Sequence, residues 1–411
     1  MQQNQSVANP LQQLAAAELD HGDEEFVKFR SAVSTFASGA RERSAEIDAA
    51  RTVPKDLIED MRSIGIFRMS IPKSLGGMEL DFPRSLEILQ ILARADASLG
   101  WVVMIGAHIP LTASALPPES YEAIFADSPG VIGAGAAIPP GVAEIVDGGY
   151  RVSGRWAFLS GSPHADYMYG VCCRTRDGKK VPGLPQILCY APAKEWTLED
   201  TWYTLGLRGT GSNDARLNDV FIPEEMTFEV PPRTNVPGPL YAMPRPYYTL
   251  TFAAVVVGIA KGAIDEIVDH ANSGKRLSRG RAALRDSPVF VHELGRASAA
   301  VEAAEAYLSS IANASWDGVL ADKASATEEV RIAQAAVWLA TTAASAIDAC
   351  YALAGSSVVY EGSPLQKRLR DIRTAMQHAA ASTNFYGLWG RVVLGMDPED
   401  GEYALTPYTD C

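Results

Sequence analysis

The sequence contains none of the short motifs by which proteins most often bind a nucleotide or perform catalysis with their own side chains. It has no Gly-x-Gly-x-x-Gly after a strand, no Gly-Lys-Ser/Thr, no His-Glu-x-x-His and no Gly-x-Ser-x-Gly. Its 6 histidines are too widely spread to suggest a metal site. A Rossmann site, a P-loop, a zinc protease and a serine hydrolase are therefore disfavoured, and we expect the chemistry to come from a cofactor.

Positive charge is also scarce. There are 36 Lys and Arg against 49 Asp and Glu, a net charge of −13, so we expect neither nucleic acid nor anionic membrane as a partner. The beginning of the sequence has no basic region followed by an apolar segment, which predicts no signal peptide and a cytoplasmic protein. The most apolar run, 250–260, ends at Lys261, short of the roughly 20 residues that span a bilayer.

Cysteine is sparse, with 5 residues and no Cys-x-x-Cys pair. Cys172 and Cys173 are adjacent on an expected strand, so their side chains point to opposite faces and cannot jointly hold a metal. We expect buried thiols and no metal.

The order of patterns along the 411 residues predicts an α+β, mostly α protein. Apolar residues recur at helical spacing in the first third, and short alternating segments bounded by glycine and proline follow. Four long helical tracts then suggest a four-helix bundle. The predicted parts are an N-terminal helical domain, a central β-barrel or sandwich and a C-terminal bundle, at 1–130, 131–235 and 236–411.

The first informative stretch of the β part ends in Ser160. Trp156, Phe158 and Ser160 alternate along an expected strand, so they should share one face before Gly161 breaks the ladder. An aromatic wall and a hydroxyl would then point the same way. An ordinary barrel with an aromatic core fits the same spacing.

The second stretch is rich in glycine. Gly206, Gly209 and Gly211 would let backbone amides approach a ligand closely. Hydrogen-bond donors stand between and after them, at Arg208, Thr210 and Ser212. Such a loop suits a planar ring or a phosphate.

These two stretches resemble the middle domain of the acyl-CoA dehydrogenase superfamily, and a segment of the expected C-terminal helix resembles a signature of the same superfamily. The resembling segments are Ser-Gly-x-x-His-Ala-Asp from Ser160, Gly-Leu-Arg-Gly-Thr-Gly-Ser from Gly206, and Pro-x-x-x-x-x-Arg-Asp, which ends at Arg370 and Asp371. Eight residues after that Asp, common acyl-CoA dehydrogenases carry a catalytic glutamate, whereas this sequence has Ala379 beside His378. The details are most similar to the branch of two-component, reduced-flavin-dependent monooxygenases.

The resemblance implies roles for individual residues. Ser160 would hydrogen-bond the flavin near N5, Trp156 or Phe158 would form a wall beside the ring, and the loop of Arg208, Thr210, Gly211 and Ser212 would cradle the flavin or close the substrate side. Arg276 resembles an arginine that reaches a flavin phosphate across a subunit interface, with Arg279, Arg281 and Arg285 as rivals.

The resemblance also suggests the histidines that act in catalysis. His378 would deliver a proton or brace the ring, and His108, on an apolar helix, would line the substrate pocket and take a phenolic proton, although a lone histidine there is usually a core residue. His164 is interpreted as structural. Glu361 is interpreted as a decoy of the dehydrogenase base, with an alternative catalytic role left open.

The implied function is that of an oxygenase component taking FMNH2 or FADH2 from a separate NAD(P)H-dependent flavin reductase. It would use O2, through a C4a-hydroperoxyflavin, to hydroxylate a small aromatic or polycyclic substrate, and would be a homotetramer. Three alternatives stay open: an acyl-CoA dehydrogenase with bound FAD, an N- or S-oxygenase, and a non-catalytic scaffold with the same fold.

Overall fold

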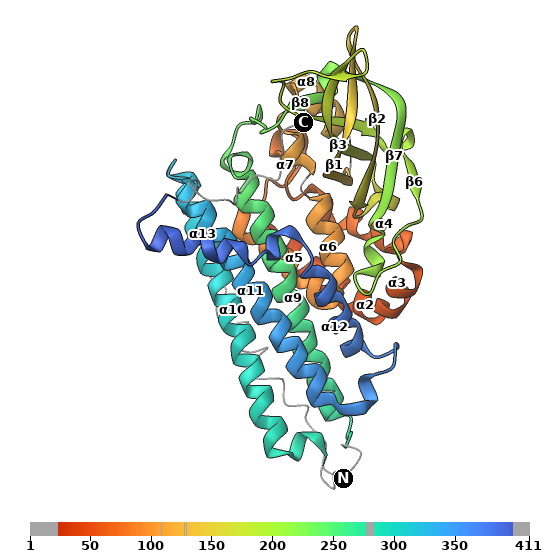
Figure 1. The fold of residues 1–411 in the computed structure, drawn as a ribbon. Coiled ribbons are helices and arrows are strands. Elements are labelled where there is room, and N and C mark those ends of the chain that lie inside the picture. Colours follow the sequence, from red (N-terminus) through yellow and green to blue (C-terminus); the bar gives the residue numbers. More distant parts are fainter. Residues whose placement is uncertain (1–23, 108, 127, 129, 277–282, 398–411) are drawn as a thin grey trace.

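A computed structural model describes residues 24–107, 109–126, 128, 130–276 and 283–397. In chain order, helices, a β unit and a set of long helices follow one another, and the β unit lies at one end of the molecule (Figure 1). This order of an N-terminal helical part, a central β unit and C-terminal helices is the one predicted, so the predicted fold class is confirmed.

The N-terminal helices begin at caps that the sequence supplies. Asp81 accepts from the amide of Arg84 at the start of one helix, and Asp96 accepts from the amides of Ser98 and Leu99 at the start of the next. The helices are α2 (Glu24–Glu42), α3 (Ser44–Ala50), α4 (Lys55–Ile64), α5 (Phe82–Ala95), α6 (Ala97–Gly106), α7 (Ile109–Ala113) and α8 (Pro118–Phe125).

The β unit is one mixed sheet with the strand order β6-β7-β2-β1-β3-β5-β8, and β4 pairs with β3. β1 and β3 are parallel, and the other pairs are antiparallel. The strands are β1 (Gly133–Val146), β2 (Gly149–Leu159), β3 (Tyr167–Arg176), β4 (Lys179–Lys180), β5 (Ile187–Pro192), β6 (Thr197–Glu199), β7 (Asn213–Pro223) and β8 (Thr227–Glu229).

The end of β2 differs from the sequence prediction. Its pairing with β7 shifts register between Trp156 and Leu159, and Phe158 has a φ of 65°. This irregularity turns Phe158 outward to 70% exposure, whereas Trp156 is fully buried. The predicted common face of Trp156, Phe158 and Ser160 is therefore wrong, because period-2 alternation requires an unbroken ladder.

Cysteines lie on β3, β5 and a C-terminal helix. Cys172, Cys189 and Cys350 are buried free thiols, as the sequence predicted. Cys173 is disulfide-bonded, so the expectation of free thiols is wrong for this residue.

The C-terminal part contains three long helices, α9 (Pro244–Asn272), α10 (Pro288–Leu320) and α11 (Ala326–Ala354). The fourth predicted tract, 364–393, is not one helix. It divides into α12 (Pro364–Ala375), a short turn capped by His378, and α13 (Asn384–Val393). The segment Ala326–Val358 is long and apolar enough to span a membrane, but half of its apolar window is buried inside the protein, as in a core helix.

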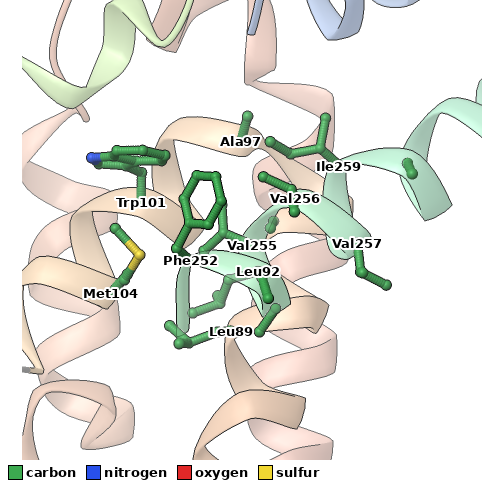
Figure 2. Close-up of a cluster of buried hydrophobic side chains, with 14 of the residues drawn as sticks. Leu89, Leu92, Ala97, Trp101, Met104, Phe252, Val255, Val256, Val257 and Ile259 are labelled. Atoms are coloured by element: carbon green, nitrogen blue, oxygen red, sulfur yellow. The ribbon is translucent and has the colours of Figure 1, made fainter. Parts of the chain in front are cut away.

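Close packing of α5 on α9 joins the N- and C-terminal helices. At Gly258 of α9, an added Cβ would lie 2.6 Å from the carbonyl oxygen of Gln90 and 2.8 Å from Cβ of Ala93, so only glycine allows this approach. Figure 2 shows the apolar cluster beside this contact, with Trp101 of α6 next to Phe252 of α9. The two aromatic side chains are thereby held where the helices meet.

Candidate functional site

Three hydroxyl groups form a continuous row at the junction of the β unit and the helices. Ser160 Oγ lies 2.6 Å from Ser212 Oγ, and Ser212 Oγ lies 2.6 Å from Thr210 Oγ1. Trp101 Nε1 donates to Ser160 Oγ at 3.2 Å. All four side chains are buried, so every polar atom among them needs a partner within the protein. We call Ser160, Ser212 and Thr210 the hydroxyl chain.

His378 contacts the rings of Trp101 and Phe252. Its ring stacks on Phe252, with centroids 5.3 Å apart and an interplanar angle of 20°, and it meets the edge of Trp101 at 5.6 Å. Trp101 and Phe252 are themselves 6.1 Å apart in an edge-to-face arrangement. Trp101 therefore connects the hydroxyl chain to the histidine, and the structure brings Ser160 and His378 into one site.

The ring of His378 has a defined tautomer. The amide of Ala380 donates to Nδ1 at 3.2 Å, so the neutral ring carries its proton on Nε2. Desolvation lowers the pKa of His378 to about 4, although more than a third of the residue's surface is accessible. The direction of the shift makes His378 a neutral Nε2–H donor at pH 7 rather than an imidazolium.

The glycine-rich loop is held by α12. The amide of Gly206 donates to Thr374 Oγ1 at 2.9 Å, and the amide of Leu207 donates to Asp371 Oδ1 at 2.7 Å. The amide of Gly206 is therefore not available to a ligand, and the sequence prediction that it would approach one is wrong. The amide of Leu207 is engaged in the same way. Glycine is needed at position 206 because an added Cβ would lie 2.1 Å from the carbonyl oxygen of Arg370.

Arg208 points away from the hydroxyl chain. Its Nε donates to the carbonyl of Thr204 at 3.0 Å, and its Nη1 pairs with Glu361 at 2.9 Å and with Asp48 at 3.6 Å. Glu361 is thus the partner of an arginine. Within the described part of the chain, neither Ser160 nor His378 hydrogen-bonds to a carboxylate.

A buried ionic network lies beneath the loop. Lys367 Nζ lies 2.8 Å from both Asp96 Oδ2 and Asp371 Oδ2, and all three residues are buried. Burial alone lowers the pKa of Lys367, but attraction to Asp371 and Asp96 outweighs this and raises it above its ordinary value. Because Asp96 caps α6 and Asp371 holds Leu207, the network fixes the helix of Trp101 relative to the loop of Thr210.

The other predicted residues lie in different surroundings. Trp156 is in the core of the β unit, where its Nε1 donates to the carbonyl of Val171 at 3.1 Å, so it cannot form a wall beside a ligand. Phe158 is exposed and lies 6.3 Å from Trp202 between ring centroids. Arg276 is exposed and pairs through its backbone with Ala283. His108 lies outside the described residues, as do Arg279 and Arg281.

His164 is bound within the protein, with Nε2 2.9 Å from Thr52 Oγ1, consistent with a structural role. Desolvation lowers its pKa from 6.5 to about 4. The unfolded chain therefore binds the proton more tightly than the folded protein does. The free energy of unfolding should fall by roughly 3 kcal/mol as the pH is lowered from above 6.5 to below 4.

We expect His164→Gln to remove most of this acid destabilisation, measured by urea unfolding at neutral and acidic pH. His292→Gln, at an exposed histidine, is the control, and equal acid sensitivity of wild type and His164→Gln would contradict the assignment.

Two concave regions lie away from these residues. One, of about 630 Å³, is on the β unit and is bordered by Arg151, Tyr190 and Phe221, and one of about 240 Å³ lies between α10 and α11 beside Trp338. Neither contains a predicted site residue. The polar groups around Trp101, rather than these hollows, define the candidate site, because they provide directed hydrogen bonds next to an aromatic surface.

The sequence analysis missed Trp101 and Phe252. Trp101 lies in an apolar helix, and its position in the sequence is typical of a core residue. A buried indole N–H needs a hydrogen-bond acceptor, however, and this requirement could have indicated a polar group beside it. Phe252 lies in the apolar run 250–260 of α9, so no pattern distinguishes it from its neighbours.

Two family models match the chain. The acyl-CoA dehydrogenase N-terminal domain family matches residues 23–116, and the acyl-CoA dehydrogenase C-terminal domain family matches residues 250–383. The chain belongs to the acyl-CoA dehydrogenase family, in the group of flavin-dependent monooxygenases.

Individual relatives align over almost the whole chain. Indole-3-acetate monooxygenase of Pseudomonas putida is 32% identical over 374 residues, which cover 90% of this chain and 95% of the relative. The oxygenase component of the FADH2-dependent resorcinol hydroxylase of Rhizobium sp. is 29% identical, covering 92% and 96%. The structure of XiaF from Streptomyces sp., in complex with FADH2 and glycerol, has a TM-score of 0.86 at 26% identity, covering 98% of this chain and all of XiaF.

Proposed function

We propose that the protein is the oxygenase component of a two-component flavin-dependent monooxygenase that hydroxylates an aromatic or polycyclic substrate. It would take FMNH2 or FADH2 from a separate NAD(P)H-dependent flavin reductase. The observation that carries the proposal is the joining of Ser160 and His378 through Trp101, with no carboxylate bonded to either within the described residues. A dehydrogenase base would need a carboxylate there, whereas oxygen transfer needs a dry site with neutral hydrogen-bonding groups.

The residues present fit a flavin. Ser160 Oγ accepts from Trp101 and still has room for one more hydrogen bond, and the Nε2–H of His378 has no hydrogen-bond partner among the described residues. Reduced flavin, when bound, supplies the electrons that activate O2 and carries the oxygen to the substrate. Ser160 would hold the ring at N5, His378 would offer a neutral donor to the oxygen or the substrate, and Trp101 and Phe252 would keep water out.

The residues of the glycine-rich loop differ in their contacts with Ser160. Ser212 contacts Ser160 directly, and Thr210 contacts Ser212. Arg208 instead forms an ion pair with Glu361 and supports the loop. Gly211 has a φ of 52°, and an added Cβ would lie 2.9 Å from Pro163, so glycine lets the loop pass close to the end of β2. Arg276 remains our candidate for a phosphate contact.

We also propose a homotetramer, as the resemblance implied. Support comes from large apolar side chains that are exposed on the long helices, at Val289, Val291, Leu320 and Trp338. Light scattering coupled to gel filtration measures the assembly directly, and a monomer at micromolar concentration would overturn the proposal.

Turnover with a supplied flavin reductase tests the function. The protein, a reductase, NADH, FMN or FAD and isotopically labelled O2 are incubated with indole-3-acetate, resorcinol and other aromatic compounds. We expect a hydroxylated product that contains one labelled oxygen atom and that is absent without the reductase. A protein that is yellow as purified and is bleached by an acyl-CoA would instead be an acyl-CoA dehydrogenase.

A further inference from the structure

The hydroxyl chain has only one possible direction of donation, and this direction is set at Leu207. Thr210 Oγ1 lies 2.8 Å from the carbonyl oxygen of Leu207. A carbonyl oxygen only accepts, so the single hydroxyl proton of Thr210 points at Leu207. At the 2.6 Å contact between Ser212 and Thr210, the proton must then come from Ser212.

The same reasoning continues to Ser160. The proton of Ser212 is used toward Thr210, so the 2.6 Å contact between Ser160 and Ser212 must be made by the proton of Ser160. Trp101 is a donor only, and it donates to Ser160 Oγ from the other side. The hydroxyl of Ser160 thus donates its proton to Ser212 and accepts from Trp101 with one lone pair. Its second lone pair is free to accept one more hydrogen bond.

The anchor of the chain is rigid. The carbonyl of Leu207 also accepts from Trp202 Nε1 at 3.0 Å and from the amide of Thr210 at 3.1 Å. The amide of Leu207 is held by Asp371, which belongs to the buried ionic network with Lys367. Reversing the chain would require breaking the bond from Thr210 to this carbonyl, with no solvent to replace it, because Thr210 and Ser212 are almost completely buried.

We infer that Thr210 and Ser212 select the redox state of the flavin by fixing Ser160 as a hydrogen-bond acceptor. This inference rests on the proposed function, in which Ser160 meets the flavin at N5. Reduced flavin carries a proton on N5 and donates, whereas oxidised flavin has a lone pair on N5 and accepts. The free lone pair of Ser160 therefore accepts a hydrogen bond from reduced flavin and opposes the lone pair of oxidised flavin. Thr210 and Ser212 are positioning residues, since they act through Ser160.

The test is the ratio of two dissociation constants, for oxidised FMN and for dithionite-reduced FMN, titrated anaerobically into the full-length protein. Ser212→Ala removes the acceptor of the Ser160 proton, which can then turn toward N5 and donate to oxidised FMN. We expect the ratio of oxidised to reduced dissociation constants to fall by about tenfold, mainly through tighter binding of oxidised FMN. FAD is titrated in the same way.

Two further variants separate direction from packing. Thr210→Val keeps the shape of the side chain but takes the acceptor from Ser212, so the proton of Ser212 can turn to Ser160 and the ratio should also fall. Thr210→Ser keeps the hydroxyl and should keep the wild-type ratio. Ser162→Ala is the matched control. Ser162 is a buried serine of the same region, but it donates to the carbonyl of Gly211 and is not part of the hydroxyl chain.

The possible outcomes are distinct. If reduced FMN binds and Ser212→Ala and Thr210→Val leave the ratio unchanged, the inference is overturned while the proposed function stands. If neither redox state binds the wild type, the proposed function fails and the inference fails with it. A matching decrease in the reduction potential of bound FMN in Ser212→Ala would support the inference without any turnover measurement.

Discussion

Replacing Lys367 with methionine is expected to lower the free energy of unfolding by about 3–5 kcal/mol. The substitution leaves the carboxylates of Asp96 and Asp371 facing each other, both with no exposed surface and without their shared cation. An unpaired buried charge costs more than the ion pair itself contributes, so the loss exceeds that of a surface pair. Urea unfolding followed by circular dichroism measures the difference.

The matched control is Lys28→Met. Lys28 forms an exposed pair with Glu24 at 3.9 Å, and such pairs contribute at most about 1 kcal/mol. Adding Asp371→Asn to Lys367→Met removes one of the two stranded charges and should recover part of the lost stability. If Lys367→Met were as mild as Lys28→Met, the network would not be the joint between α6, α12 and the glycine-rich loop.

Ser160→Ala is expected to reduce the ratio of hydroxylated product to hydrogen peroxide by about tenfold, the effect of losing one buried hydrogen bond of roughly 1.4 kcal/mol. Hydrogen peroxide should account for the missing product, because the oxygen is released when the flavin is not held at N5. Product and peroxide are quantified in the same reaction with a flavin reductase present.

This result depends on the position of the hydroxyl rather than on its polarity alone. Ser162→Ala removes a buried hydroxyl nearby and should leave the ratio of product to peroxide at the wild-type value. The affinity for reduced flavin, measured separately, distinguishes weaker binding from faster release of peroxide. An unchanged product yield in Ser160→Ala would show that Ser160 does not contact the reacting part of the flavin.

His378 illustrates how the structure changes a predicted role. From the sequence, an imidazole near the flavin suggested a group that titrates near neutral pH. The ring stacks on Phe252 and meets the edge of Trp101, and desolvation lowers its pKa to about 4. Of the two predicted roles, the geometry favours the neutral brace over the titrating proton donor, because charging the ring in this position is unfavourable.

The sequence alone determined the order of the helical and β parts and the stretches that are candidates for the site. Helical periodicity, the alternation of short segments and the Pro-x-x-x-x-x-Arg-Asp segment depend on neighbouring residues, so they can be read without the fold. The family resemblance of these segments made Ser160 and His378 candidate site residues, although they are far apart in the sequence.

Only the tertiary structure decided which of these groups meet and which way they point. The register shift after Trp156 placed that side chain in the core, the carbonyl of Leu207 set the direction of the hydroxyl chain, and Trp101 joined Ser160 to His378. Each depends on contacts between segments distant in the sequence, and local patterns carry no information about them. A buried proton takes its direction from the acceptor that the folded chain brings to it.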